Sequence, residues 1–214
     1  MKKVVLIGAS GFVGTPVLGE LLARGIKVTA VVHDAAKIST KNENLTVVSA
    51  DVFDIEKLAN IIAGNDAVIN AFNAGWTNPN LYADFLKGCE SIQQAVKQSG
   101  VKRLLVVGGA GSLFIGDGQL VDSPQFPAEY KAGATAARDY LAILRTEVEL
   151  DWTFLSPAIN LHPGTRTGKF SLGTENPVFD EQGKCEISVE DMAIAIVDEI
   201  ENGQFIKQRF TLGY

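Results

Sequence analysis

Cysteine is scarce in this sequence, and the little there is forms no motif. Cys89 and Cys185 are the only two cysteines, and no CxxC spacing relates them. A disulfide framework or a cysteine-based zinc site is therefore not expected, and a reducing compartment is the default. We expect both thiols to be inert packing groups and expect no bound metal.

Long apolar runs and clusters of basic residues are missing as well. No apolar stretch approaches the roughly 18 residues of a membrane span, and the run 4–7 is too short for the core of a signal peptide. The chain has 19 Lys and Arg against 25 Asp and Glu, and its basic residues form no long run of the kind that contacts nucleic acid. These absences predict a cytoplasmic protein without a membrane or nucleic-acid partner.

Short β-branched runs alternate with helical patterns along the 214 residues. The expected strands are 4–7, 28–32, 46–49, 67–70, 103–107 and 152–155. The expected helices are 13–24, 55–63, 82–98, 128–146 and 189–201. Several strands are continuously apolar, which is typical of a parallel sheet covered on both faces.

This pattern predicts an α/β protein with a doubly wound parallel sheet, the Rossmann fold, in a single domain of residues 1–214. The late segment 157–187 is rich in Gly, Pro and Thr. We expect it to form a small, loop-rich C-terminal lobe that covers the substrate side of the fold.

The opening turn, "IGASGFVG", carries glycines with GxxGxxG spacing at Gly8, Gly11 and Gly14. It follows a strand and precedes a helix, whose first N–H groups and dipole suit a pyrophosphate. Glycine lets the backbone come close to that anion. The alternative is a tight turn that only packs the helix closely. We expect the whole turn to contact a dinucleotide: Gly8, Ala9, Ser10, Gly11, Phe12, Val13 and Gly14.

Several motifs together resemble the atypical short-chain dehydrogenases/reductases: "IGASGFVG", "ADVFD", "VVGGAGSLF", "EYKAGA", "DWTFLSPA" and "ISVEDMA". Within that group the sequence is most similar to the NAD(P)H-binding proteins known as NADH-flavin reductases or NAD-dependent epimerase/dehydratases, which also resemble biliverdin reductase B. The likeness covers nearly the whole chain. It implies the fold and a nicotinamide cofactor more specifically than it implies a substrate.

The choice between NAD and NADP depends on the end of the second strand, where the chain reads His33, Asp34 and then Lys37 a turn later. An acidic residue ending this strand favours the ribose 2′-hydroxyl of NAD, whereas a cation favours the 2′-phosphate of NADP. Similar sequences often carry Arg in place of His33, which implies NADP. We expect NADP(H) over NAD(H), with His33 and Lys37 at the phosphate; the alternative is that His33 merely ends the strand.

The resemblance implies further cofactor contacts at the ends of later strands. Asp51 and Val52 would lie near the adenine, with Asp54 and not Asp51 as the cap of the following helix. Other expected contacts are Ala71, Phe72, Asn73 and Pro157. Phe72 could equally be a core residue.

The family's catalytic pattern is broken in this chain. Ordinary members use a Ser after the fifth strand and a Tyr whose pKa is lowered by a Lys four residues later. Ser112 is present, but Tyr130 is followed at that position by Ala134. Lys131 is adjacent to Tyr130, about 100° around the helix, so the two cannot form the usual pair.

Ser112, Lys131 and Tyr130 remain the candidate catalytic residues, although a solvated lysine and a packed or exposed tyrosine are the alternatives. Hydride transfer to a flat conjugated acceptor such as a flavin needs alignment more than an acid or base. We therefore expect an NAD(P)H-dependent oxidoreductase for such a small-molecule acceptor, a monomer or homodimer. Its apolar floor would be formed by Trp76, Leu113 and Phe114, each of which could instead be ordinary loop packing. The alternatives are a sugar epimerase/dehydratase and a non-catalytic NAD(P)-sensing regulator.

Overall fold

An eight-stranded sheet lies at the centre of the protein, which is described over residues 2–214 by a computed structural model. The strand order is β10-β12-β8-β5-β4-β1-β2-β3. Every neighbouring pair is parallel except β10 with β12. The strands are β1 Lys3–Ile7, β2 Lys27–Val32, β3 Leu45–Ser49, β4 Ala67–Asn70, β5 Arg103–Val107, β8 Asp151–Ser156, β10 Ser171–Gly173 and β12 Gln208–Gly213.

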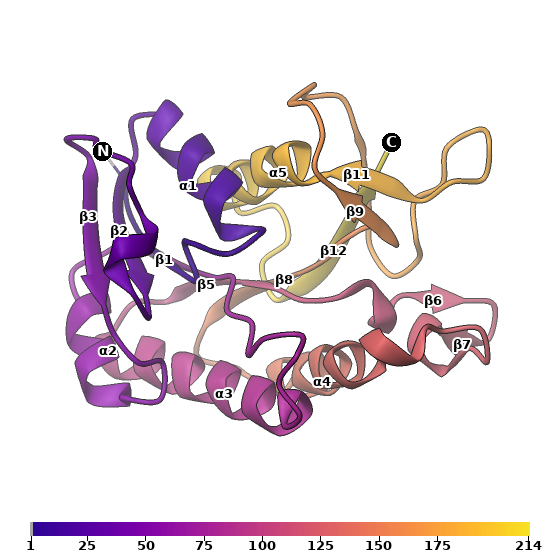
Figure 1. Ribbon diagram of the computed structural model, residues 1–214, viewed down its shortest axis with the longest axis horizontal. Helices are drawn as coiled ribbons and strands as arrows, with labels where there is room; N and C mark the ends of the chain where they lie inside the picture. Colours follow the sequence, from indigo (N-terminus) through magenta and orange to yellow (C-terminus); the bar gives the residue numbers. More distant parts are fainter. Residues whose placement is uncertain (1) are drawn as a thin grey trace.

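Five α-helices cover the two faces of this sheet (Figure 1). They are α1 Gly14–Ala23, α2 Ile55–Ile62, α3 Leu81–Ser99, α4 Ala128–Leu144 and α5 Val189–Asn202. Helices α1 and α5 pack on one face, and α2, α3 and α4 lie side by side on the other. The sequence prediction of a doubly wound Rossmann fold is confirmed.

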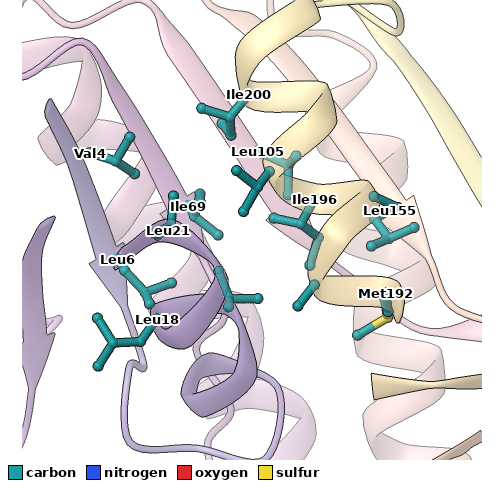
Figure 2. Close-up of a cluster of buried hydrophobic side chains, with 14 of the residues drawn as sticks. Val4, Leu6, Leu18, Leu21, Ile69, Leu105, Leu155, Met192, Ile196 and Ile200 are labelled. Carbon is teal, nitrogen blue, oxygen red and sulfur yellow. The ribbon is translucent and has the colours of Figure 1, made fainter. Parts of the chain in front are cut away.

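Two hydrophobic clusters, one on each face, explain why the strands are continuously apolar. Side chains alternate along a strand, so Val4 and Leu6 of β1 join the cluster under α1 and α5, whereas Val5 and Ile7 join the cluster over α2, α3 and α4. Figure 2 shows the first cluster, in which side chains of α1 and of α5 pack together with those of the strands beneath them.

The helix ends follow from single residues. Asp54 caps α2 by accepting the Lys57 N–H at 3.1 Å, as the sequence predicts. Ser188 caps α5 by accepting the Asp191 N–H at 3.0 Å. At the other end of α5, Gly203 has a φ of 63°, a left-handed conformation that glycine adopts without strain.

Short pairings fill the remaining segments. β9 Asn160–His162 pairs with β11 Glu186–Ser188, and β6 Phe114–Ile115 pairs with β7 Gly118–Gln119. Single 3-10 turns lie at η1 Ala35–Lys37, η2 Ala110–Ser112 and η3 Leu120–Asp122. The segment 157–187 thus contains short strands, but most of it is irregular, as its composition predicts.

The strand order reverses at β1, which lies between β2 and β4. The chain runs outward from β1 through β2 to β3, and then crosses back to β4 and continues to β5 and β8. In open sheets of this kind, ligands bind beyond the carboxyl ends of the strands at the reversal point. The residues that follow β1 and β4 are therefore the first place to look for a site.

Candidate cofactor site and active site

The glycine turn follows β1, and two of its three glycines are required by the fold itself. Gly8 has a φ of 80°, and a Cβ there would lie 2.4 Å from the carbonyl oxygen of Ala71. A Cβ on Gly14 would lie 2.0 Å from the Gly8 carbonyl oxygen. These two positions exclude side chains because the strand, the turn and α1 pack against one another.

Gly11 is different, because it is exposed and a Cβ there would meet only the Gly8 carbonyl oxygen, at 3.2 Å. That separation is tighter than most real Cβ contacts but longer than those at Gly8 and Gly14, and the backbone would have to move by a few tenths of an ångström. The protein's own packing therefore leaves room above Gly11, at the spot where a pyrophosphate would approach. This open cradle fits the dinucleotide.

The start of α1 is also suited to an anion. No side chain within residues 2–214 caps this helix at Val13, and its first turn carries no acidic residue. The first N–H groups of a helix lack partners inside the helix and carry partial positive charge. In α1 the Thr15 N–H donates to the Gly11 carbonyl at 3.0 Å and Pro16 has no N–H, so the backbone N–H groups of 12–14 are the candidate donors for phosphate oxygens.

At the end of β2, the side chains of His33 and Lys37 are exposed. The one carboxylate between them, that of Asp34, accepts the Ala36 N–H at 3.0 Å and so caps η1. The His33 backbone is fixed by Ser49, whose hydroxyl donates to the His33 carbonyl at 2.6 Å. Two side chains able to carry positive charge thus border this strand end, and the acidic one is engaged in a local turn.

The predicted adenine-side residues follow β3. Asp51 is exposed, and its carboxylate accepts the Phe53 N–H at 2.9 Å, which closes a turn between β3 and α2. Val52 is half-buried. Asp51 therefore shapes the local backbone, and its contact with an adenine stays a prediction.

Of the residues that follow β4, Phe72 packs against the protein and Asn73 is exposed. The half-buried Phe72 ring packs against α3, where a Cβ on Gly88 would come within 2.3 Å of it, and its contact with a cofactor stays a prediction. Its N–H donates to the buried Asn70 side chain at 3.0 Å. Asn73 is exposed and accepts the Gly75 N–H at 2.7 Å.

Register brings these strand ends to one edge of the sheet. Ile7 pairs with Asn70, and Asn70 pairs with Val106, so the segments after β1, β4 and β5 begin at the same level. Pro157, also predicted at the cofactor, follows β8 directly and is buried. The glycine turn, Ala71 to Asn73 and η2 therefore share the edge that the topology marks as the ligand side.

Ser112, in η2, is wholly buried and is held by Arg209 of β12. The Arg209 guanidinium donates to the Ser112 carbonyl oxygen at 2.7 Å and to its Oγ at 3.0 Å. The Ser156 hydroxyl lies 3.2 Å from the same Oγ. The hydroxyl of Ser112 is thus buried and occupied by protein partners, and its part in catalysis stays a prediction.

Arg209 also connects this turn to the C-terminal lobe. Its guanidinium, with a side chain 0% exposed, forms an ion pair with Glu175, which Arg145 also contacts at 3.0 Å. Burial lowers the pKa of Arg209, and the Glu175 carboxylate opposes that effect. The Phe114 N–H donates to the Glu175 carbonyl at 2.9 Å. Sequence reasoning missed Arg209, because a single arginine in a C-terminal strand carries no motif.

The predicted apolar floor is corrected at one position. Leu113 is fully buried, so it packs inside the protein and cannot face a ligand. The Phe114 ring lies against the Arg209 guanidinium, 5.8 Å from ring centre to guanidinium carbon. Trp76 is different, since it is 57% exposed.

The first turn of α4 presents Tyr130 and Lys131 to solvent. Tyr130 is 50% exposed, and its ring lies edge-on to Trp76, with centroids 5.5 Å apart. Ala134 occupies the position one turn later and is buried. The position that a lysine occupies in ordinary members of the family thus holds a buried alanine here.

The chain matches the NAD(P)H-binding family over residues 8–203 and belongs to that family. The protein YwnB of Bacillus subtilis, which is uncharacterised, is 38% identical and aligns over 98% of this chain and 97% of its own. A solved candidate epimerase from Bacteroides thetaiotaomicron is 46% identical, with a TM-score of 0.93 and coverage of 100% and 97%. A candidate NADH-flavin reductase from Streptococcus pneumoniae is 37% identical, with a TM-score of 0.88 and coverage of 100% and 99%.

These comparisons confirm the resemblance to the atypical short-chain dehydrogenases/reductases. The protein has an oxidoreductase-like, NAD(P)H-binding fold, and its ligands are small molecules that include a nicotinamide cofactor. Between residues 2 and 214, no helix has the length and apolar character that a membrane span requires.

Proposed function

We propose that this protein is an NADPH-dependent reductase that transfers hydride to a flavin or a similarly flat, conjugated acceptor. The observation that carries the proposal is the environment of Tyr130. Ala134 occupies the position that a lysine has in ordinary members of the family. The Tyr130 ring is half-exposed and packs edge-on against Trp76. That arrangement supports binding of a flat ring more than removal of a proton.

The chemistry distinguishes this proposal from the epimerase alternative. An epimerase or alcohol dehydrogenase must take a proton from a hydroxyl as hydride leaves, which requires a tuned acid/base group. Reduction of a conjugated ring requires stacking against the dihydronicotinamide, and solvent can supply the proton. The similarity to a candidate epimerase supports the epimerase alternative, and the similarity to a candidate NADH-flavin reductase supports the reductase.

NADPH is the proposed cofactor. His33 and Lys37 are exposed beside the end of β2, and Asp34 is engaged in capping η1. A 2′-phosphate that lies between the His33 and Lys37 side chains would gain charge-assisted hydrogen bonds. The opening turn, Asp51, Val52, the 71–73 segment and Pro157 would hold the remainder of the cofactor.

We further propose that residues 1–214 act as one cytoplasmic domain, a monomer or homodimer, with 157–187 on the substrate side. Glu175, which lies within that segment, contacts Arg209 and so reaches the turn that carries Ser112. This connection gives the segment a route to influence the active site.

The test is a steady-state screen of NADPH oxidation against flavins, quinones and nucleotide sugars. Oxidation by FMN or menadione, with no reaction of nucleotide sugars, is the expected result. Turnover of a nucleotide sugar alone would replace the reductase with an epimerase/dehydratase. Tight NADPH binding without oxidation by any acceptor would instead favour a non-catalytic regulator.

A further inference from the structure

Two half-exposed aromatic rings contact each other at the carboxyl edge of the sheet. Trp76 is 57% exposed and Tyr130 is 50% exposed. Their centroids lie 5.5 Å apart and their planes meet at 86°, which is the edge-to-face geometry that aromatic pairs favour. The two residues come from segments far apart in sequence, one after β4 and one at the start of α4. The pair forms a corner of apolar surface that remains open to solvent.

The position of Trp76 is built into the fold. A Cβ on Gly133 of α4 would lie 2.8 Å from the indole ring, so the absence of a side chain there makes room for the tryptophan. The same Cβ on Gly133 would lie 3.2 Å from a methyl of Leu81, the first residue of α3. The indole therefore lies against α4 at Gly133, close to the first residue of α3, and this packing lowers the entropic cost of ordering the ring against a ligand.

The pair lies on the side of the fold that the cofactor's nicotinamide should occupy. His33 and Asp51 follow β2 and β3, to one side of β1, and are the expected contacts for the adenosine half. Trp76 follows β4, and Tyr130 follows β5 along the chain, on the opposite side of β1. A dinucleotide that crosses the reversal point with its pyrophosphate at Gly11 therefore ends near this corner.

We propose that Trp76 and Tyr130 form the binding wall for the acceptor, with its flat conjugated ring stacking on the indole beside the nicotinamide. This inference rests on the proposed reductase function, and it names the residues that would select the acceptor. Aromatic faces attract other flat π systems through stacking and loss of apolar surface to water. Tyr130 contributes its ring, which braces the indole edge-on, and its hydroxyl is not required.

The test measures binding separately from turnover, by calorimetric titration of FMN, and in parallel menadione, into protein saturated with NADP⁺. Trp76→Ala should weaken binding of these probes by about tenfold, as expected for one lost stacking contact. Tyr130→Phe should keep the affinity within about twofold, because the ring is retained. Tyr130→Ala should weaken it by an intermediate factor, and NADP⁺ affinity should not change in any variant.

Val148→Ala is the matched control. Among residues 2–214, Val148 is the most exposed large hydrophobic residue, at 76%, and it lies just before β8 begins, at the opposite edge of the sheet. This variant should bind the probes as the wild type does. Circular dichroism and an unchanged NADP⁺ affinity establish that each variant is folded.

Two outcomes overturn the inference. If wild-type protein saturated with NADP⁺ binds neither FMN nor menadione, no acceptor wall exists. If the wild type binds the probes and Trp76→Ala binds them equally well, the acceptor does not bind at Trp76. That result would overturn this inference even if turnover with FMN supports the proposed function. Conversely, loss of binding in Trp76→Ala supports the inference even if no NADPH is oxidised, so the two proposals fail separately.

Discussion

Gly8, Gly11 and Gly14 have different physical reasons to be glycine. The backbone of the protein already occupies the space that a Cβ would need at Gly8 and at Gly14. Gly11 has a single contact, and that contact requires only a small adjustment. The surrounding backbone therefore requires glycine at positions 8 and 14 more strictly than at position 11, and the proposed contact with a pyrophosphate is a further reason for glycine at position 11.

Gly11→Val should abolish NADPH binding while leaving the fold intact, because its branched side chain fills the space above the turn. Calorimetry of NADPH binding and a thermal melt together measure the two effects. Gly19→Ala is the control, because it lies in α1 with no atom within 4 Å of its added Cβ. Unchanged NADPH affinity in Gly11→Val would mean that the turn is structural only.

The cofactor preference is also decided by single residues. Wild-type protein should bind NADPH about tenfold more tightly than NADH, from one charge-assisted contact of about 1.5 kcal/mol. His33→Asp should reverse this order, because a carboxylate repels the 2′-phosphate and accepts from the 2′-hydroxyl. Lys41→Ala, in the exposed loop beyond η1, should leave it unchanged. Equal wild-type affinities for the two cofactors would refute the roles given to His33 and Lys37.

Among the elements, those with a strong local pattern were predictable and those held by distant partners were not. Strands such as β4 and β5 were predicted at their observed bounds, because continuous apolar runs ended by turn residues are distinctive. β12 was not predicted, because an arginine at position 209 is typical of an exposed segment. Only the structure shows that Arg209 is buried by its ion pair with Glu175 and its hydrogen bond to Ser112. The burial of Ser112 and Leu113 depends on the same distant contacts, so no local pattern could show it.

Helix α5 anchors the irregular C-terminal lobe through Asp191. Its wholly buried carboxylate accepts the Thr167 N–H at 2.7 Å, the Gly168 N–H at 2.8 Å and the Tyr214 hydroxyl at 2.8 Å. Burial alone would raise the pKa of Asp191, but these hydrogen bonds outweigh it and hold the pKa below 3.8. The ionised carboxylate thus stabilises the folded state.

Asp191→Asn should lower the free energy of unfolding at pH 7 by about 2 kcal/mol, the scale of hydrogen bonds to a charged group. The folded-state pKa lies below the unfolded value, so the wild-type advantage is present above the unfolded pKa and is lost as the pH falls through the folded pKa. Urea unfolding of both proteins at pH 7 and near pH 3 measures this. A difference that does not shrink at the lower pH would contradict the assignment.

On the scale of the whole molecule, the doubly wound order gathers the chemistry at one edge of the sheet. The segments after β1, β4 and β5 start level with one another, while the two hydrophobic clusters occupy the faces. Helices α1 and α5 on one face, and α2, α3 and α4 on the other, leave that edge for loops (Figure 1). The fold therefore places the glycine turn after β1 and the Trp76–Tyr130 pair at the same edge of the sheet.

If the proposed hydride transfer needs no tyrosine acid/base, Tyr130→Phe should change turnover with saturating NADPH and FMN by only a few-fold. Ser112→Ala and Lys131→Ala, which disturb positioning, should each lower turnover by about tenfold, whereas proton-transfer catalysis is typically worth roughly 10²- to 10⁴-fold. A loss of about a thousandfold or more in Tyr130→Phe would instead make Tyr130 the general acid/base of an epimerase or alcohol dehydrogenase.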